Sequence, residues 1–294
     1  MSIFKGCGTA MITPFRDDKL DFCAFSRQIE FQISNHADAL VICGTTGEAS
    51  TMNFDEKLSA FRFAVEKSKK RIPIIAGTGG NNTREVIALS KAAALEGVDA
   101  LLIVTPYYNK TTQNGLIAHY TAIAESVSLP IIVYNVPSRT GVNVLPATMY
   151  ELSKNKNITA IKEASGNIEQ IVTLASKLTN CDIYSGNDDH VLPVLSLGGI
   201  GVISTVSNII PSDMHNLCEA FFAGDLKKAQ DFQFKLLPIC KAAFCEVNPI
   251  PIKTMMNILN MDAGELRLPL VPPSDENKRI MQKAILDYHL EVNI

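Results

Sequence analysis

The chain has 294 residues, of which 47% are hydrophobic and 19% are charged, and its formal net charge is −3. This balance, without a block of basic residues, argues against nucleic acid or an anionic membrane surface as a partner. The N-terminus has no apolar signal core, and no stretch approaches the ~20 apolar residues that would span a bilayer.

Short apolar runs rich in β-branched residues recur along the chain, each followed by a longer stretch with helical periodicity. Eight of these runs are predicted to be strands, at residues 8–13, 39–43, 73–77, 100–105, 130–134, 158–162, 182–185 and 201–204. Helices are predicted between and after them, at about 21–36, 55–70, 83–96, 112–127, 146–154, 167–178, 188–197 and 211–223. The runs are nearly continuously apolar, which is typical of parallel strands covered by helices.

Eight strand-then-helix units predict an α/β fold of the (β/α)8 TIM barrel type. A doubly wound open sheet is the alternative, but its Gly-x-Gly-x-x-Gly after the first strand is missing. After Gly224 no strand signal remains, and helices are predicted at 225–245, 251–260 and 275–291. We therefore expect a catalytic barrel over residues 1–224 and a C-terminal three-helix extension over residues 225–294.

The seven cysteines are scattered without a Cys-x-x-Cys pair, and the five histidines show no ligand spacing. This pattern predicts free thiols in a reducing cytosol, and hence a cytoplasmic protein without a metal site. Asp188 and Asp189 follow the seventh predicted strand. They are expected to favour a helix N-terminus rather than to take part in catalysis.

Lys162 closes the sixth apolar run, at the carboxyl end of a predicted buried strand. The carboxyl ends of the strands form the reactive face of such a barrel. A lysine there is half desolvated, so that its amine can be held partly neutral and can attack a ketone. The alternative is a surface lysine whose aliphatic stem packs on the core.

Hydroxyls, phenols and one arginine stand at the ends of neighbouring strands, without a histidine among them. Thr45 and Thr46 offer hydroxyls and accessible N–H groups to a carboxylate, unless their segment is only a tight loop. Tyr134 could exchange protons with an amine, or be a rim tyrosine that caps the core. Arg139 could hold a second carboxylate, or be a solvated loop charge. With Lys162, this set favours imine chemistry on a small keto acid.

Three separated motifs resemble a known family: Gly-Thr-Thr-Gly-Glu at 44–48, Tyr-Asn-Val-Pro-x-Arg-Thr-Gly at 134–141 and Lys-Glu-Ala-x-Gly at 162–166. In this order and spacing they resemble the pyruvate-dependent class I aldolase (N-acetylneuraminate lyase) family, and within it the dihydrodipicolinate synthase branch. The resemblance extends over essentially the whole chain. Sialic acid lyases and keto-deoxy-sugar aldolases of that family typically lack the Arg-Thr-Gly, so Arg139 decides the branch.

The resemblance implies a lyase that condenses pyruvate with L-aspartate-4-semialdehyde through a Schiff base, in diaminopimelate and lysine biosynthesis. No cofactor is implied, because the lysine amine is the electron sink. Lys162 would form the Schiff base, and Tyr134, Thr45 and Tyr108 would relay protons. The resemblance further implies that Tyr108 is supplied across a tight dimer interface, within a homotetramer of two such dimers.

Four residues are implied to bind the substrates. Thr46 would bind the pyruvate carboxylate, and the backbone of Ile203 would lie beside the same pocket. Arg139 would hold the carboxylate of the semialdehyde, with help from Gly186.

Many bacterial and plant members of that branch are inhibited by lysine, bound in a cleft at the dimer interface. The corresponding positions here are Ala49, Phe54, Lys57, Asn81, Glu85 and Tyr107. The last three match the family pattern, whereas the first three replace a serine and two histidines. Ala49 and Phe54 remove polar groups and Lys57 adds a positive charge, so we expect weak or absent inhibition by L-lysine.

Two alternative functions remain open. The first is another pyruvate-dependent aldolase, acting on sialic acid or a 2-keto-3-deoxy sugar acid. The second is a non-catalytic barrel that binds keto acids as a sensor, although a sensor has no need of the nucleophile that Lys162 provides.

Overall fold

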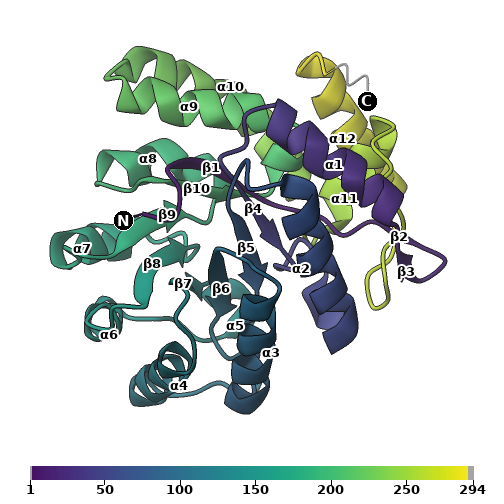
Figure 1. The fold of residues 1–294 in the computed structure, drawn as a ribbon. Coiled ribbons are helices and arrows are strands. Elements are labelled where there is room, and N and C mark those ends of the chain that lie inside the picture. Colours follow the sequence, from purple (N-terminus) through teal and green to yellow (C-terminus); the bar gives the residue numbers. More distant parts are fainter. Residues whose placement is uncertain (1, 291–294) are drawn as a thin grey trace.

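The computed structural model describes residues 2–290, and at its centre lies a closed barrel of eight parallel strands (Figure 1). The strands are β1 (Gly6–Ala10), β4 (Ala39–Ile42), β5 (Ile74–Gly77), β6 (Ala100–Val104), β7 (Ile131–Asn135), β8 (Ile158–Glu163), β9 (Asp182–Ser185) and β10 (Gly201–Ser204). Each strand pairs with its neighbours in chain order, and β1 closes the ring by pairing with both β4 and β10. The predicted (β/α)8 barrel is therefore confirmed.

A ring of helices surrounds this barrel in Figure 1. The ring consists of α1 (Phe22–Ser34), α2 (Phe54–Ser68), α3 (Thr83–Leu95), α4 (Gln113–Ser126), α6 (Pro146–Leu152), α7 (Ile168–Lys177), α8 (Val191–Ser196) and α9 (Pro211–Phe222). Several of these helices begin at a polar side chain that accepts a hydrogen bond from the first turn, as Asp21, Asn53, Asn82 and Thr112 do. Such caps satisfy N–H groups that have no partner within the helix, which is why the helices begin close to the predicted positions.

Three further helices follow the last strand: α10 (Leu226–Ala243), α11 (Ile250–Ile258) and α12 (Asp275–Asp287). They match the predicted helices within a few residues, although residue 291, the predicted end of the last one, lies outside the described residues. Helix α10 packs against α9 and α12, and α11 packs against α12. The division of the chain into a barrel and an extension at Gly224 stays a prediction.

The structure differs from the predictions in two places near functional segments. Strand β1 occupies Gly6–Ala10 rather than residues 8–13, and Pro14, which has no N–H to donate, lies just beyond the predicted end. A short antiparallel hairpin of β2 (Phe15–Arg16) and β3 (Lys19–Leu20), which was not predicted, follows it. In the loop after β7, residues predicted to be irregular form the one-turn helix α5 (Pro137–Thr140).

Side chains that alternate along the strands divide the core into two layers around the barrel wall. Ala160 and Tyr134 belong to the apolar cluster inside the barrel, whereas Ile161 and Val133 belong to the cluster between the barrel and its helices. Lys162, two residues beyond Ala160, therefore lies on the interior face of β8 at the end of that strand.

Candidate active site

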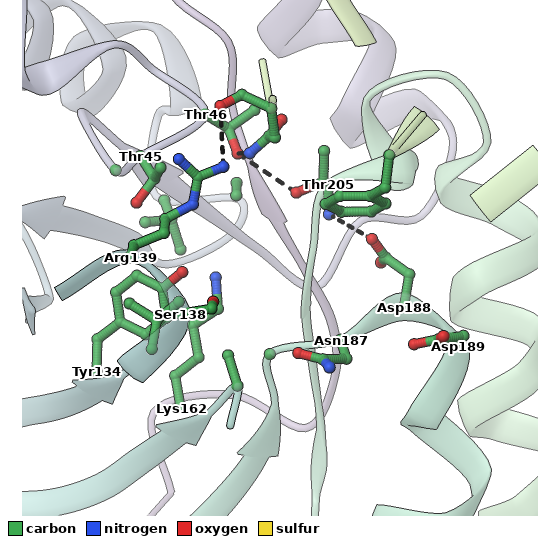
Figure 2. A pocket seen from close by; sticks show the side chains of 18 of the residues that line it. Thr45, Thr46, Tyr134, Ser138, Arg139, Lys162, Asn187, Asp188, Asp189 and Thr205 are labelled. Atoms are coloured by element: carbon green, nitrogen blue, oxygen red, sulfur yellow. Dashed lines mark hydrogen bonds between the residues drawn. The ribbon is translucent and has the colours of Figure 1, made fainter. Parts of the chain in front are cut away.

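A cavity of about 530 Å³ lies at the carboxyl ends of the barrel strands (Figure 2). Six of the residues predicted to act in catalysis or substrate binding line it: Thr45, Thr46, Tyr134, Arg139, Lys162 and Gly186. Helix α10 and the loop after it add Cys240, Lys241, Phe244 and Asn248 to the wall. The candidate site is thus formed by the strand ends together with α10 and the loop that follows it.

Lys162 and Tyr134 are the central pair of this cavity. They are register partners on β8 and β7, and the Nζ atom of Lys162 lies 4.4 Å from the centre of the Tyr134 ring. Lys162 is only 5% exposed, and what remains accessible faces the cavity, where Figure 2 shows the two side chains next to each other. The amine can therefore be reached by a small substrate that enters the cavity.

Thr46 is fixed by hydrogen bonds at the other side of the cavity. Its Oγ1 accepts a hydrogen bond from Nδ2 of Asn248 at 3.0 Å and lies 3.3 Å from Oγ1 of Thr205. Arg139 belongs to the same group, because its Nη2 donates to the main-chain oxygen of Asn248 at 3.0 Å. Asn248 therefore joins the threonine of one motif to the arginine of another.

Sequence reasoning missed Asn248 and Thr205. Asn248 lies between α10 and α11, far along the chain from either motif, and nothing in the residues around it signals a contact with Thr46. Thr205 directly follows β10, so its position at the end of a barrel strand is a signal that could have identified it.

Asp188 and Asp189 lie in the first turn of a short 3₁₀ helix (Asp188–His190), in agreement with the prediction. Asp188 also does something that was not predicted. Its carboxylate is buried and accepts hydrogen bonds from the N–H groups of Thr205 and Val206, at 3.2 and 3.4 Å. Burial raises the pKa of Asp188, and these hydrogen bonds oppose that shift. The side chain thus ties the end of β9 to the end of β10.

The remaining candidate residues occupy different environments. Gly186 lines the cavity, and a Cβ atom there would lie 2.5 Å from Cβ of Ala164, so the close approach of β8 and β9 requires glycine. Ile203 is buried in the cluster inside the barrel and is not among the residues that line the cavity. Tyr108 is 91% exposed and lies outside the cavity of its own chain.

A second cavity, of about 200 Å³, shares six lining residues with the first: Gly44, Thr45, Leu102, Tyr134, Val136 and Arg139. It reaches Ala49 and Tyr107, two of the six positions of the predicted lysine cleft. The other four, Phe54, Lys57, Asn81 and Glu85, do not line it.

Asn81, one of these four positions, contacts a residue that lines that cavity, and Lys57 and Glu85 lie near each other. The amide of Asn81 donates to the main-chain oxygen of Tyr107 at 3.3 Å, and Lys57 lies close enough to Glu85 for an electrostatic interaction. Burial lowers the pKa of Lys57, and the carboxylate of Glu85 opposes that shift.

Within residues 2–290, no helix is both long and apolar enough to cross a membrane. Over the same residues, no group of three or more His, Cys, Asp or Glu side chains has a geometry that could hold a metal ion.

The profile of the Dihydrodipicolinate synthetase family matches residues 3–287. A 4-hydroxy-tetrahydrodipicolinate synthase from Caldicellulosiruptor bescii is 53% identical over 293 residues, which cover 99% of each chain. The crystal structure of dihydrodipicolinate synthase from Thermotoga maritima matches with a TM-score of 0.96 at 42% identity, over 98% of this chain and 99% of that one. The enzyme from Cyanidioschyzon merolae with lysine bound has a TM-score of 0.96 at 34% identity, over 98% and 99% of the two chains. The chain belongs to the dihydrodipicolinate synthetase family.

Proposed function

We propose that the chain condenses pyruvate with L-aspartate-4-semialdehyde to give 4-hydroxy-tetrahydrodipicolinate, the reaction for which its relatives are named. The observation that carries the proposal is the buried amine of Lys162 beside the Tyr134 ring, in one cavity with Thr46 and Arg139. That arrangement offers a nucleophile, a phenol for proton exchange and two places where a carboxylate can bind.

The first half of the reaction is imine formation. The amine of Lys162 attacks the keto carbon of pyruvate, and the resulting carbinolamine loses one water molecule to give an iminium ion. The hydroxyls of Tyr134 and Thr45 carry the protons that the departing oxygen needs. Thr46 holds the pyruvate carboxylate, and its hydroxyl is already oriented by the amide of Asn248. This fixed donor reduces the reorganisation that binding requires.

The second half forms the carbon–carbon bond. The iminium ion draws electrons from the methyl group, which loses a proton and becomes the nucleophilic carbon of an enamine. This carbon attacks the aldehyde carbon of the semialdehyde, and the aldehyde oxygen takes up a proton. The amino group of the semialdehyde then attacks the imine carbon, which closes the ring and releases Lys162. One water molecule is lost overall, at imine formation. Arg139 binds the semialdehyde carboxylate throughout these steps, since a guanidinium pairs bidentately with a carboxylate.

A coupled assay tests this proposal. The purified chain is supplied with pyruvate and L-aspartate-4-semialdehyde, and formation of the cyclic product is followed with an excess of a nicotinamide-dependent reductase that consumes it. Consumption of pyruvate is measured in parallel with each aldehyde. Turnover is expected with this pair and not with pyruvate plus N-acetylmannosamine or a small sugar aldehyde. Turnover only with a sugar aldehyde would assign the chain to another branch of pyruvate aldolases. Imine formation without turnover of any aldehyde would favour the keto-acid sensor.

We further propose that the chain works as a homotetramer of two tight dimers in which Tyr108 serves the cavity of the neighbouring subunit. The support is that Tyr108 is 91% exposed, whereas the adjacent Tyr107 lines the second cavity. A Tyr108→Phe chain mixed with a Lys162→Ala chain should regain activity in mixed dimers, because one of the two sites then has both residues. Verified mixed dimers without any regained activity would contradict a shared site.

The free cysteines of the chain are consistent with the expected reducing, cytoplasmic location.

A further inference from the structure

A buried polar cluster lies directly behind the reactive pair, on the opposite face of the same two strands. Tyr134 and Lys162 face the cavity, and the next pair in register faces the helices instead, since side chains alternate along strands. The cluster consists of Asn135, Glu163, Asn143 and Gln170. Asn135 is 0% and Glu163 is 2% exposed, in a layer that is mostly apolar.

Glu163 is the common acceptor of this cluster. One carboxylate oxygen accepts hydrogen bonds from Nδ2 of Asn135 at 3.0 Å and from Nε2 of Gln170 at 3.1 Å. The other accepts from the N–H of Ser165 at 2.7 Å. All three donors are uncharged. A carboxylate buried in an apolar layer depends on each such donor, because no water replaces one that is lost.

Asn135 links Glu163 to the loop that carries Arg139. Its Oδ1 accepts a hydrogen bond from the N–H of Val144 at 2.9 Å, and its Nδ2 donates to Oδ1 of Asn143 at 2.8 Å. These two hydrogen bonds close the base of the segment 136–143, in which Arg139 lies. An amide has an acceptor end and a donor end. Both Glu163 and Oδ1 of Asn143 accept from the donor end. Of the two side chains only the carboxylate is unable to donate, so Glu163 determines which end of Asn135 faces Val144.

We propose that Glu163 is a positioning residue for the second substrate: through Asn135 it fixes the loop that presents Arg139 relative to Lys162. Lys162 and Glu163 are consecutive on β8, and Tyr134 and Asn135 are consecutive on β7. The cluster therefore holds the Arg139 loop to the same two strands that carry the imine-forming pair. The inference rests on the proposed function, in which Arg139 binds the carboxylate of the aldehyde.

Glu163→Gln tests the proposal, with Glu169→Gln as the matched control. Glu169 is an exposed glutamate in the first turn of α7, one residue before Gln170, and takes no part in the cluster. Glu163→Gln replaces an acceptor with an NH₂ group that faces other donors. The KM for the semialdehyde should rise about tenfold, while the KM for pyruvate and the rate of borohydride trapping of its imine change less than about threefold. An unchanged KM for the semialdehyde, or equal losses for both substrates, would overturn the positioning role.

Exchanging donor and acceptor across the two strands provides a second test. Asn135→Asp alone places two carboxylates together and should be worse than Glu163→Gln. The double variant Asn135→Asp/Glu163→Gln restores one donor and one acceptor between the strands, so its KM for the semialdehyde should fall below that of Asn135→Asp. A double variant no better than the worse single variant would contradict the proposal. If Glu163→Gln fails to fold, Asn143→Ala removes a partner of Asn135 at a half-buried position and should raise the same KM.

Hydrogen exchange provides a readout that does not depend on turnover. In Glu163→Gln, amide exchange across residues 136–144 should accelerate about tenfold relative to wild type, while exchange in the other barrel strands stays the same. Protection of that segment at the wild-type level would overturn the proposal. If the wild-type chain does not turn over the semialdehyde, the proposed function fails, and the exchange comparison still decides whether Glu163 positions the Arg139 loop.

Discussion

The Nζ atom of Lys162 lies 4.4 Å from the centre of the Tyr134 ring, and the two residues are register partners on adjacent barrel strands. The β7–β8 pairing therefore joins the second motif of the sequence to the third. The neighbour of the amine is a phenol rather than a carboxylate. Tyr134 can give and take a proton without placing a permanent negative charge beside the amine, which suits a reaction that passes through an iminium ion.

Replacing Lys162 with alanine should abolish imine formation. Wild-type chain treated with pyruvate and borohydride should lose activity and carry one reduced adduct on the peptide that contains Lys162. Lys162→Ala should form no such adduct, and its kcat should fall by several orders of magnitude, because a covalent path is lost. Peptide mass spectrometry after the reduction measures the adduct.

Lys241 provides the control for this experiment, because it is a second lysine that lines the same cavity but comes from α10. Lys241→Ala should still form the adduct on Lys162. An adduct on Lys241, or on any other lysine, would show that the nucleophile has been assigned wrongly.

Much of this site could be predicted from the sequence because local patterns carry the information. Apolar runs end at Tyr134 and Lys162, and in a parallel barrel all strand ends meet on one face. Two residues at separate strand ends were therefore predicted to meet without knowledge of the detailed register. The one-turn helix that carries Arg139 was not predicted, because four residues are too few to show helical periodicity.

Contacts between distant segments could not be predicted in this way. The amide of Asn248 bonds to Thr46, and the ammonium of Lys253 pairs with Glu48, yet each pair is separated by about two thirds of the chain. Such contacts depend on how α10 and α11 dock on the barrel, and no local periodicity records that. The alternation of Lys162 and Glu163 was visible in the sequence. Two partners of Glu163, Ser165 and Gln170, are close to it in the chain, but Asn135 lies on the neighbouring strand β7.

Arg139→Ala should separate the two substrates. A carboxylate left in the cavity without its guanidinium is expected to lose about 2–5 kcal/mol of binding free energy. The kcat/KM for the semialdehyde should therefore fall at least about thirtyfold, whereas imine trapping with pyruvate changes little. Arg139→Lys keeps the charge but not the planar guanidinium. Its kcat/KM for the semialdehyde should therefore lie between the values for wild type and Arg139→Ala. Equal losses of condensation and of trapping would mean that Arg139 supports the fold or the pyruvate site instead.

Inhibition by L-lysine should be weak or absent. The half-buried Lys57 would repel a cationic ligand near the second cavity, and Glu85 already accepts a hydrogen bond from the side chain of Asn82 at 2.8 Å. The lost hydrogen bonds and the added repulsion together predict an affinity roughly tenfold to a thousandfold below that of a sensitive enzyme. The coupled assay with L-lysine, against potassium chloride at equal ionic strength, measures this. Half-inhibition below about 1 mM would refute the expectation.

Lys253→Met should strongly destabilise the fold. Lys253 and Glu48 form an ion pair of 2.7 Å, with side chains 1% and 0% exposed, and Lys253 also donates to the main-chain oxygens of Thr13 and Glu265. Removing the lysine leaves a buried carboxylate unpaired, which is expected to lower the free energy of unfolding by about 3–5 kcal/mol. Urea unfolding measures the change.

Two further variants separate the buried charge from a general effect of substitution. Glu48→Gln/Lys253→Met removes both charges and should be more stable than Lys253→Met alone. Lys154→Met breaks an exposed pair with Glu151 and should have little effect. A double variant less stable than Lys253→Met would show that the Glu48 carboxylate stabilises the fold through other contacts, such as the N–H of Arg267, and would contradict the cost assigned to the unpaired charge.

His119 should make the fold sensitive to acid. It is buried on α4 and its Nδ1 lies 2.8 Å from Oγ1 of Thr83 on α3. Burial lowers the pKa of His119 from 6.5 to about 4. Between these two values the unfolded chain binds more protons than the folded one, so stability present above pH 6.5 is lost as the pH falls towards 4.

His119→Gln keeps a partner for Thr83 and cannot titrate, so its midpoint of thermal unfolding should fall less over this range than that of wild type. His289→Gln, at an exposed position, should follow the wild type. Parallel pH profiles for wild type and His119→Gln would mean that other groups cause the acid sensitivity.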